Sequence, residues 1–447
     1  MLKMLKTHYW PWLVLLLITI IFHSNHPLNS DEGIVLEGAW NLINHKELYI
    51  DFFEFVAPGS FYLIFFVWKI FGISYFAAKL ISVMLLFLAA IGIYQISQQI
   101  KKGWINHLAP TIFILSSFYW PIINANVFNV FFIIWAIYFL LLGLERKQVA
   151  KFIIAGLLTS MAIIFLQSKG IIFLLAVILF IVLLAIKQKK AIWLKSGLYY
   201  FLASLLPLVL LLIKWPLPLL YDNLVAFPLN HYMGINQLPF YILGFFGALL
   251  IILLIKYWKN ANAKIWLLLW LQFILLLTTI PRPDFYHISL VVFPIYILLI
   301  LASQTNKLSS YIRIVLLSVM VFVIILPSLI YLTPPFSSIK YHAVWPEIEK
   351  NCQDSPYLYS GPFMPGLYFE TRKINPGPFY ALFTDFNAEE DFIVTKQALE
   401  KHQPTCAILN YGIVAKFQYN QDNPLDNYIQ NNYQLIYQDD QTLIYKK

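Results

Sequence analysis

The chain has 447 residues, of which 60% are hydrophobic, 17% are aromatic and only 12% are charged. Because soluble globular domains carry about 25% charged residues, this composition excludes an ordinary soluble protein. The formal net charge is +9, but the basic residues gather in short loops between apolar runs. That distribution is typical of membrane orientation, and we do not interpret it as nucleic-acid affinity.

Apolar runs suited to crossing a bilayer, which takes about 20 helical residues, recur along the chain. The sequence therefore predicts an α-helical polytopic membrane protein with about eleven transmembrane helices. The first run follows Lys3 and Lys6 and has no small-residue cleavage site after it, so we expect a retained anchor. The predicted spans are residues 9–23, 75–99, 108–123, 127–144, 152–167, 170–186, 196–213, 240–257, 265–280, 287–303 and 311–332.

Basic residues alternate between the two sets of loops. One set carries sixteen basic residues against one acid, Glu145, and the opposite set carries six beside eight acids. Because cytoplasmic loops are enriched in Lys and Arg, we expect the N-terminus in the cytoplasm. The first loop and the C-terminal tail then lie on the outer face of the cytoplasmic membrane.

The first external loop, residues 24–74, is acidic. Its stretch Asn29–Pro58, NSDEGIVLEGAWNLINHKELYIDFFEFVAP, holds six of the chain's 22 acidic residues. The helical spacing of apolar residues over 34–44 predicts a surface helix, capped by Asn29, Ser30 or Asp31. Residues 58–72 predict a second helix that lies in the membrane interface. The loop is either an ordinary solvated connection or a catalytic loop lying on the bilayer.

Later external turns contain ionisable residues at the ends of apolar spans. Lys169 is a single cation in an apolar hairpin and either snorkels to the interface or binds a phosphate group. Residues 214–239 form a lid or a further interfacial helix. The turn after residue 280 contains Arg282, Asp284, Tyr286 and His287. Arg282 and Asp284 either form a surface pair of little energetic weight or contribute to a site, and we favour the site.

The composition changes after the last span, and residues 335–447 contain no long apolar run. Short strands at 357–359, 407–409, 433–437 and 442–445 alternate with helices at 391–402 and 424–431, which predicts a small α/β domain with a hairpin at 439–441. Cys352 and Cys406 are the only cysteines. Whether they form a disulfide depends on their separation, which the sequence does not give.

Residues 29–87 combine three features in order. These are the pair Asp31–Glu32, the acid Glu54 shortly before Pro58, and the phrase FGISYFAAKL at residues 71–80. The stretch resembles the opening module of the membrane-embedded GT-C glycosyltransferases, most of all bacterial relatives of the protein O-mannosyltransferases and of the lipid A aminoarabinose transferase. The hairpin at 169–170 and the turn at 282–287 resemble the same family. Pro58–Gly59 departs from the two prolines frequent in relatives, which affects the local turn.

The resemblance implies a glycosyltransferase that takes a sugar from a polyprenyl-phosphate donor at the outer face of the cytoplasmic membrane. The acceptor is a lipid, a glycan or a protein hydroxyl. Together with the composition, it implies a transmembrane domain at 1–334, with the catalytic loop at 24–74, and an extracytoplasmic α/β domain at 335–447.

Such a transfer requires a carboxylate that takes the acceptor proton and cations that hold the departing phosphate. We predict a single, inverting displacement. Asp31 is predicted to be the general base, with Glu54 as the second catalytic candidate. Glu54 and Glu32 would position the acceptor or a divalent metal ion, whose requirement stays open. Lys169 and Arg282 would bind the phosphate, and the remaining substrate-binding candidates are Asp51, Asp284, Tyr286 and His287. We interpret Glu37 and Glu47 as solvated surface residues.

Two other classes of function fit a polytopic protein with an external domain. One is a transporter or flippase of lipid-linked sugars, and the other is a non-enzymatic subunit of a cell-envelope complex. Charges are almost absent from the middle of the predicted spans, and no internal repeat of the kind common in transporters is evident. The sequence also lacks Gly-rich phosphate loops, CxxC pairs, HExxH and GxSxG motifs. We therefore favour the transferase.

Overall fold

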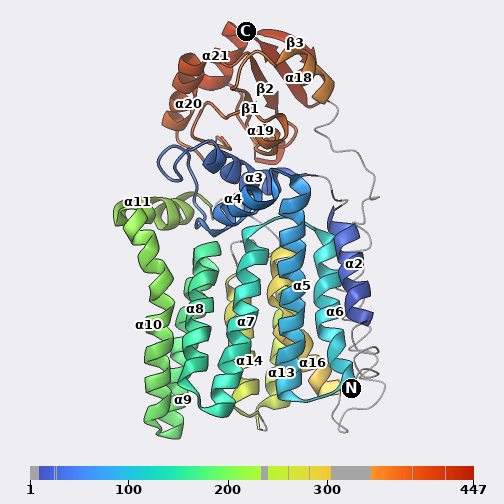
Figure 1. The fold of residues 1–447 in the computed structure, drawn as a ribbon, viewed down its shortest axis with the longest axis vertical. Helices are drawn as coiled ribbons and strands as arrows, with labels where there is room; N and C mark the ends of the chain where they lie inside the picture. Colours follow the sequence, from blue (N-terminus) through green and yellow to red (C-terminus); the bar gives the residue numbers. More distant parts are fainter. Residues whose placement is uncertain are drawn as a thin grey trace.

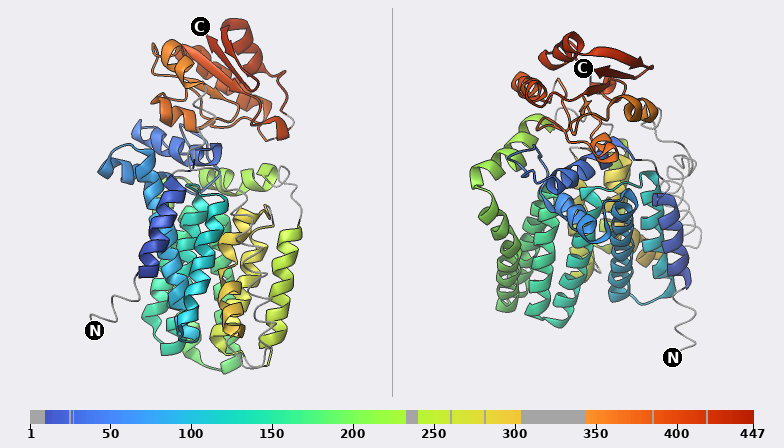
Figure 2. Two further views of the ribbon diagram at one scale, coloured as in Figure 1. Left: turned by 90° about the vertical axis from the view of Figure 1, so that its right-hand side faces the viewer. Right: turned by 45° about the horizontal axis from the view of Figure 1, so that its top comes forward.

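The computed structural model describes residues 10–24, 26, 28–232, 240–259, 261–280, 282–303, 344–384, 386–417 and 419–447. A bundle of long helices forms its lower part, and a small α/β part forms its upper part (Figure 1). The two helices of the first loop, α3 (Ser30–Ile43) and α4 (Gly59–Phe71), lie between these parts. Two further views keep this order (Figure 2). The first loop and the C-terminal part thus share one end of the bundle.

Ten of the eleven predicted spans coincide with helices. The eleventh, 311–332, lies outside the described residues. Four described helices are long and apolar enough to cross a membrane, and the bent pair α15–α16 makes a fifth. The multi-pass character is therefore supported, whereas the count of eleven is not established. The bundle comprises α2 (Trp10–Ser24), α5 (Tyr75–Ile100), α6 (Leu108–Ser116), α7 (Ala125–Arg146), α8 (Val149–Phe165), α9 (Gln167–Gln188), α10 (Ala191–Lys214), α13 (Tyr241–Tyr257), α14 (Ala263–Leu277), α15 (Phe285–Val291) and α16 (Phe293–Ser303).

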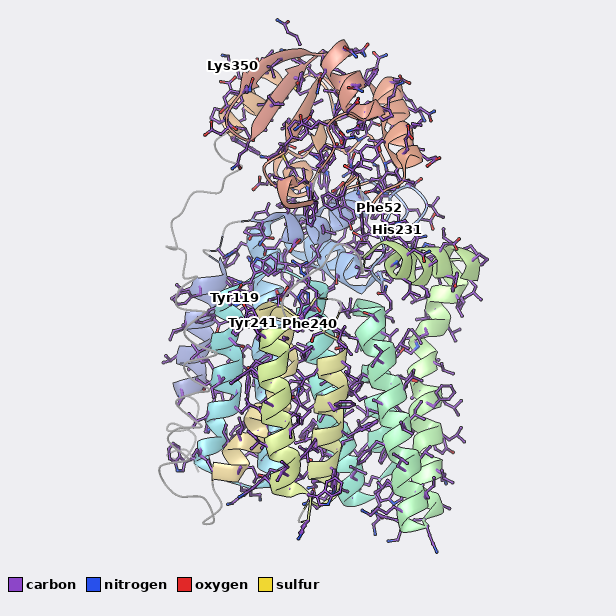
Figure 3. The ribbon with its side chains drawn as sticks, turned by 180° about the vertical axis from the view of Figure 1, so that it is seen from behind. Phe52, Tyr119, His231, Phe240, Tyr241 and Lys350 are labelled. Carbon is purple, nitrogen blue, oxygen red and sulfur yellow. A yellow bond between two sulfur atoms is a disulfide. The ribbon has the colours of Figure 1, made fainter. Side chains whose placement is uncertain are left out.

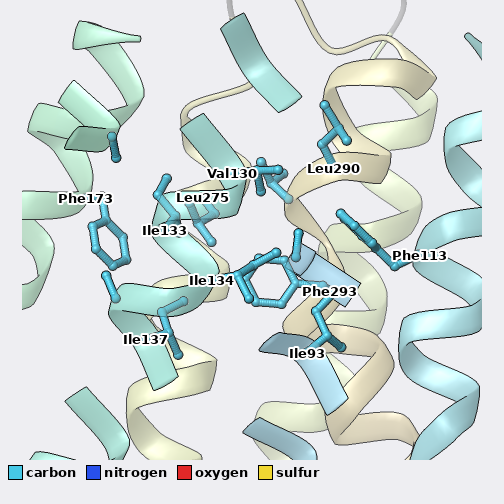
Figure 4. Close-up of a cluster of buried hydrophobic side chains, with 14 of the residues drawn as sticks. Ile93, Phe113, Val130, Ile133, Ile134, Ile137, Phe173, Leu275, Leu290 and Phe293 are labelled. Carbon is cyan, nitrogen blue, oxygen red and sulfur yellow. The ribbon is translucent and has the colours of Figure 1, made fainter. Parts of the chain in front are cut away.

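Large apolar side chains fill the centre of the bundle. Ile93 of α5, Phe113 of α6, Ile134 of α7 and Phe293 of α16 are fully buried and meet there (Figure 4). Within a bilayer the surrounding lipid is as apolar as these side chains, so close van der Waals packing holds the helices together. This rigid bundle supports the turns at the end that carries the first loop and the C-terminal part (Figure 1).

The break between α15 and α16 has a local cause. Pro294 has no N–H group, so it cannot donate a helical hydrogen bond to the carbonyl of Leu290. The two helices are bent by 57° at this break. The short α15 packs against α6, α7 and α14, which fixes the turn that precedes it.

Both helices predicted in the first loop are present. The Asn29 side chain caps α3 by accepting a hydrogen bond from the backbone N–H of Glu32 at 3.0 Å. After α10 the chain turns sharply into α11 (Leu217–Tyr221), which lies across the end of the bundle (Figure 1). Two π-helical turns follow, at Asp222–Ala226 and Pro228–Tyr232. This favours the interfacial-helix interpretation of residues 214–232, while 233–239 lie outside the described residues.

The predicted small C-terminal sheet is confirmed. Its four strands have the order β1-β2-β4-β3, with β1 and β2 parallel and the other pairs antiparallel. The predicted hairpin joins β3 to β4. The strands are β1 (Tyr359–Gly361), β2 (Cys406–Asn410), β3 (Gln434–Gln438) and β4 (Thr442–Lys446), and the helices are α18 (Trp345–Asn351), α19 (Gly366–Thr371), α20 (Glu389–His402) and α21 (Pro424–Asn432).

The C-terminal part packs directly on the first loop. A Cβ atom added to Gly33 would lie 2.4 Å from the backbone nitrogen of Gly366, so only glycine allows α3 and α19 to approach so closely. The Trp40 indole donates a hydrogen bond to the Lys373 carbonyl at 2.8 Å. Phe52 and His231 lie at the level of this contact, above Tyr119 and Tyr241 at the end of the bundle (Figure 3).

Cys352 and Cys406, whose pairing the sequence left open, form a disulfide with a Cα–Cα distance of 5.5 Å. The bond ties the end of α18 to the start of β2 across 54 residues. Cross-linking a loop of that length restricts the unfolded chain, so replacing both cysteines by serine is expected to destabilise the sheet by about 2–4 kcal/mol. Hydrogen exchange of the β2 and β4 amides measures this loss. Unchanged exchange in the variant would contradict it.

Candidate active site

The turn that precedes α15 forms a compact group of ionisable side chains. Asp284 caps α15 by accepting the backbone N–H of His287 at 2.9 Å, and its carboxylate also lies 2.8 Å from His287 Nδ1. Arg282 Nε donates to the other carboxylate oxygen at 3.1 Å. Burial disfavours the charged carboxylate, but the His287 hydrogen bonds and the Arg282 charge hold the pKa of Asp284 below its ordinary value. The predicted pairing of Arg282 with Asp284 therefore exists, inside a larger network.

Lys169 joins this group from the first turn of α9. Its buried ammonium donates to Asn126 Oδ1 at 2.7 Å and interacts electrostatically with Asp284 and His287. The close crossing of α8 and α9 allows this position. A Cβ atom on Gly170 would lie 2.6 Å from the Ile163 backbone, so glycine is required beside the lysine. Lys169 is 6% exposed, so the snorkelling interpretation does not describe it.

Glu32 is the anchor of the first loop. Its carboxylate forms a fully buried ion pair with Lys79 of α5 and accepts hydrogen bonds from the Tyr75 hydroxyl and the Ile123 backbone N–H, each at 2.8 Å. Lys79 also donates to the Pro121 carbonyl. These bonds fix the beginning of α3 to α5 and to the segment before α7. Glu32 therefore positions its neighbour Asp31.

Asp31 lies within electrostatic range of Tyr286 in α15. It lies in the first turn of α3 and is half-buried, so its carboxylate retains solvent access. Tyr286 is in electrostatic range of Asp31, Glu32, Asp284 and Arg282. The structure thus gathers Asp31, Glu32, Lys169, Arg282, Asp284, Tyr286 and His287 at one end of the bundle, although they come from three segments far apart in sequence.

Glu54 belongs to a second group, beside Glu37. Both side chains are buried, at 1% and 2% exposure, and both line a small cavity with Asn41. The interpretation of Glu37 as a solvated residue is wrong, because residues 375–380 cover it and Asn375 donates to its Oε1 at 2.9 Å. Burial raises the pKa of Glu37 to about 8 and raises the pKa of Glu54 well above its usual range.

Gln167 connects the two groups. Its side-chain amide donates to the Phe55 carbonyl at 2.8 Å, and its carbonyl accepts the Ala57 backbone N–H at 3.0 Å. The turn that follows Glu54 is therefore fixed to the same helical turn that carries Lys169. Glu37 and Tyr49 interact electrostatically with Glu54, and the backbone N–H groups of Phe55 and Val56 donate to its carboxylate.

Asp51 has a local structural contact. It is exposed, and its carboxylate accepts the backbone N–H of Glu47 at 2.7 Å, which closes the turn after α3. Glu47 is exposed, as interpreted from the sequence. Neither acid joins the two groups described above, and Asp51 remains a substrate-binding prediction.

Sequence reasoning missed four supporting residues: Lys79, Asn126, Gln167 and Asn375. Lys79 lies within the phrase FGISYFAAKL, so the signal was present, but its partner could not be identified. The other three are neutral side chains that act through contacts between distant segments. No three His, Cys, Asp or Glu side chains within the described ranges gather closely enough to hold a metal ion.

Comparison with known proteins identifies the architecture. Residues 56–215 match the family model described as dolichyl-phosphate-mannose-protein mannosyltransferase. ArnT from Cupriavidus metallidurans bound to undecaprenyl phosphate has a similar structure over 97% of this chain and 98% of that chain, with a TM-score of 0.63 and 14% sequence identity. The chain has the GT-C fold of membrane glycosyltransferases.

A second solved structure agrees with this GT-C assignment. The archaeal oligosaccharyltransferase AglB from Archaeoglobus fulgidus, in complex with an inhibitory peptide and a dolichol-phosphate, covers 91% of this GT-C chain and 70% of its own, with a TM-score of 0.60 and 10% identity. No curated protein sequence matches the chain. The resemblance noted in the sequence is therefore confirmed at the level of the GT-C fold.

The Asp284 contacts allow a test of the turn. Asp284→Ala removes the cap of α15 and is expected to lower the free energy of unfolding by about 1–2 kcal/mol. Asp284→Asn keeps a good capping residue and loses the charge facing Arg282 and His287, so it should be less destabilising than Asp284→Ala. SDS titration of both purified variants measures the difference. Equal stability of the two variants would exclude a capping contribution.

Proposed function

We propose that the protein is an integral membrane glycosyltransferase. It moves a sugar from a polyprenyl-phosphate donor to a hydroxyl group of a lipid, glycan or protein acceptor. The observation that carries the proposal is that Tyr286 lies within electrostatic range of both Asp31 and Arg282, while the adjacent His287 lies within range of Lys169 and Arg282. A carboxylate beside two cations is the arrangement that a lipid-phosphate leaving group requires.

Asp31 acts as the general base in this proposal. Its carboxylate takes the proton of the acceptor hydroxyl as the hydroxyl oxygen bonds to the anomeric carbon. The bond from that carbon to the phosphate oxygen breaks, and its electron pair leaves with the polyprenyl phosphate. Because the attack and the departure occur on opposite faces, the anomeric configuration inverts. Asp31 suits this role because it is held by Glu32 and is half-buried at the start of α3.

The two cations hold the phosphate as its charge develops. Lys169 offers a point charge from a buried position, where it attracts an anion more strongly than it would in water. Arg282 offers a planar set of donors that suits phosphate oxygens. Asp284 accepts a hydrogen bond from Arg282 and contacts His287, and Tyr286 lies within electrostatic range of Asp31 and Arg282.

We also propose how the chain is arranged in the membrane. Residues 1–334 form the transferase domain, with its catalytic loop at 24–74, and residues 335–447 form the outer α/β domain. The N-terminus lies in the cytoplasm, and the site opens on the outer face of the cytoplasmic membrane. Two observations support this. The first loop and the C-terminal sheet share one end of the bundle (Figure 1), and the basic loops after α5, α7 and α9 follow from the other end.

Donor turnover by reconstituted protein tests the function. Proteoliposomes containing the purified chain would receive undecaprenyl phosphate carrying radiolabelled mannose or aminoarabinose, together with an envelope lipid extract as acceptor. A transferase converts the labelled donor to undecaprenyl phosphate and a new labelled product. A flippase moves the intact donor across the bilayer without releasing its sugar, and a non-enzymatic subunit leaves it unchanged. Either of the last two outcomes with both donors would overturn the proposal.

A further inference from the structure

Trp120 contacts the turn that carries Arg282. It follows the short helix η2 (Ser117–Tyr119). The guanidinium carbon of Arg282 lies 5.9 Å from the indole centroid, which is within the range of a cation–π contact. The Tyr286 ring lies 5.2 Å from the same indole, and Tyr286 is itself within electrostatic range of Asp31. Trp120 is therefore in contact with a proposed phosphate-binding cation and with a residue close to the proposed base.

The segment that carries Trp120 is held on both sides. Before it, Tyr119 packs edge-on against Phe285 of α15, with the ring centroids 4.9 Å apart. After it, the backbone N–H of Ile123 donates to the buried Glu32 carboxylate at 2.8 Å. The position of the indole is thus fixed relative to α15 and to the beginning of α3.

The indole of Trp120 keeps an unused hydrogen-bond donor. The indole N–H groups of Trp40, Trp68 and Trp270 donate to backbone carbonyls at 2.8, 2.9 and 2.9 Å. Within the part of the chain that the structure describes, the N–H of Trp120 has no acceptor, and its nitrogen is not shut off from solvent. The side chain as a whole is half-buried. Such an indole offers a ligand both an apolar ring surface and a hydrogen bond.

The proposed phosphate contact determines which part of the donor comes near this indole. In a polyprenyl-phosphate donor, a single oxygen atom joins the sugar ring to the phosphate. A phosphate held by Arg282 therefore brings the sugar next to the side chains that contact Arg282. Of these, Tyr286 is only 2% exposed, whereas Trp120 is half-buried and more accessible.

We infer that Trp120 binds the sugar of the polyprenyl-phosphate donor. The C–H groups of a sugar ring pack against an aromatic surface, and a sugar hydroxyl accepts a hydrogen bond from the indole N–H. Polyprenyl phosphate without its sugar makes neither contact. The inference rests on the proposed function and adds to it a binding residue for the transferred group.

Binding of two lipids to the purified full-length protein separates recognition of the sugar from recognition of the phosphate. One lipid is undecaprenyl phosphate. The other, the loaded lipid, is undecaprenyl phosphate carrying whichever of mannose and aminoarabinose the parent transfers. Trp120→Ala should weaken binding of the loaded lipid by about tenfold or more, and should change binding of undecaprenyl phosphate by less than about twofold. Trp104→Ala replaces a tryptophan that is 82% exposed and should bind both lipids as the parent does.

Trp120→Phe keeps an aromatic ring but has no N–H group. It should weaken binding of the loaded lipid by about fivefold, which corresponds to the loss of one hydrogen bond. The KM for the loaded lipid should rise in parallel in both variants. Thermal unfolding checks that the variants fold, and Trp120→Phe decides the question if Trp120→Ala does not.

Three results would overturn the inference. Equal weakening of both lipids in the Trp120 variants would assign Trp120 to the phosphate instead of the sugar. Parental binding of the loaded lipid by these variants would exclude a contact with the sugar while leaving the transferase proposal intact. A parent protein that transfers neither sugar would contradict the proposed function itself, and the sugar-binding role of Trp120 would fall with it.

Discussion

Asp31→Asn is expected to lower the rate of sugar transfer by about 10²–10⁴-fold. Asparagine has the size of aspartate but cannot take the acceptor proton. Because Asp31 is half-buried and the adjacent Glu32 carries the anchoring contacts, the substitution should leave the fold unchanged. Initial rates of undecaprenyl phosphate release in proteoliposomes measure the effect.

Glu47→Gln is the matched control for this prediction. It removes one negative charge from the same loop at an exposed position, so it should transfer sugar at the parental rate. A rate within twofold of the parent for Asp31→Asn, together with loss of activity in Glu54→Gln, would assign the general base to Glu54 instead. A similar loss of the transfer rate in Glu47→Gln would mean that the overall negative charge of the loop, rather than Asp31 itself, controls the rate.

Lys79→Met is expected to destabilise the protein by about 3–5 kcal/mol. Lys79 and Glu32 form an ion pair in which both side chains are 0% exposed. Removing the ammonium leaves the Glu32 carboxylate buried with only its two remaining hydrogen-bond donors, Tyr75 and the Ile123 backbone. The beginning of α3 should then detach from α5, and sugar transfer should fall with it.

A double variant separates the charge from the packing. The double variant Glu32→Gln/Lys79→Met leaves no charge at the position of this pair. It should therefore recover much of the stability that Lys79→Met loses. Lys69→Met removes an exposed lysine from α4 and serves as control. SDS titration monitored by tryptophan fluorescence measures the stability of the parent, of Lys79→Met, of the double variant and of Lys69→Met. Parental stability of Lys79→Met would contradict a structural role for the pair.

The sequence was most informative about local structure. An apolar pattern of helical period after Asn29, Ser30 and Asp31 predicted α3 with three candidate caps, of which Asn29 caps the helix. Local patterns likewise predicted the four strands and the helices α20 and α21 of the C-terminal part, whereas α18 and α19 were not predicted. The pairing of Cys352 with Cys406 stayed open, because it depends on how residues 54 positions apart meet in space.

Burial by distant segments could not be predicted. Glu37 lies on the polar side of its helix, so the sequence pattern alone predicts that its side chain is exposed to solvent. Its burial comes from Asn375 and neighbouring residues, 338 positions later in the chain. Lys79 lies near the end of the phrase FGISYFAAKL, yet it pairs inside the protein with Glu32, 47 positions earlier. Such contacts follow from tertiary packing, for which one sequence gives little information.

A structure of the protein with undecaprenyl phosphate bound would test the proposed site most directly. The arrangement of Asp31, Lys169 and Arg282 predicts that a phosphate oxygen lies within about 4 Å of Lys169 Nζ or of the Arg282 guanidinium, the range of an ion pair. The Asp31 carboxylate would face the acceptor side of the same space. A phosphate group bound at the opposite end of the bundle, or away from both cations, would contradict the account.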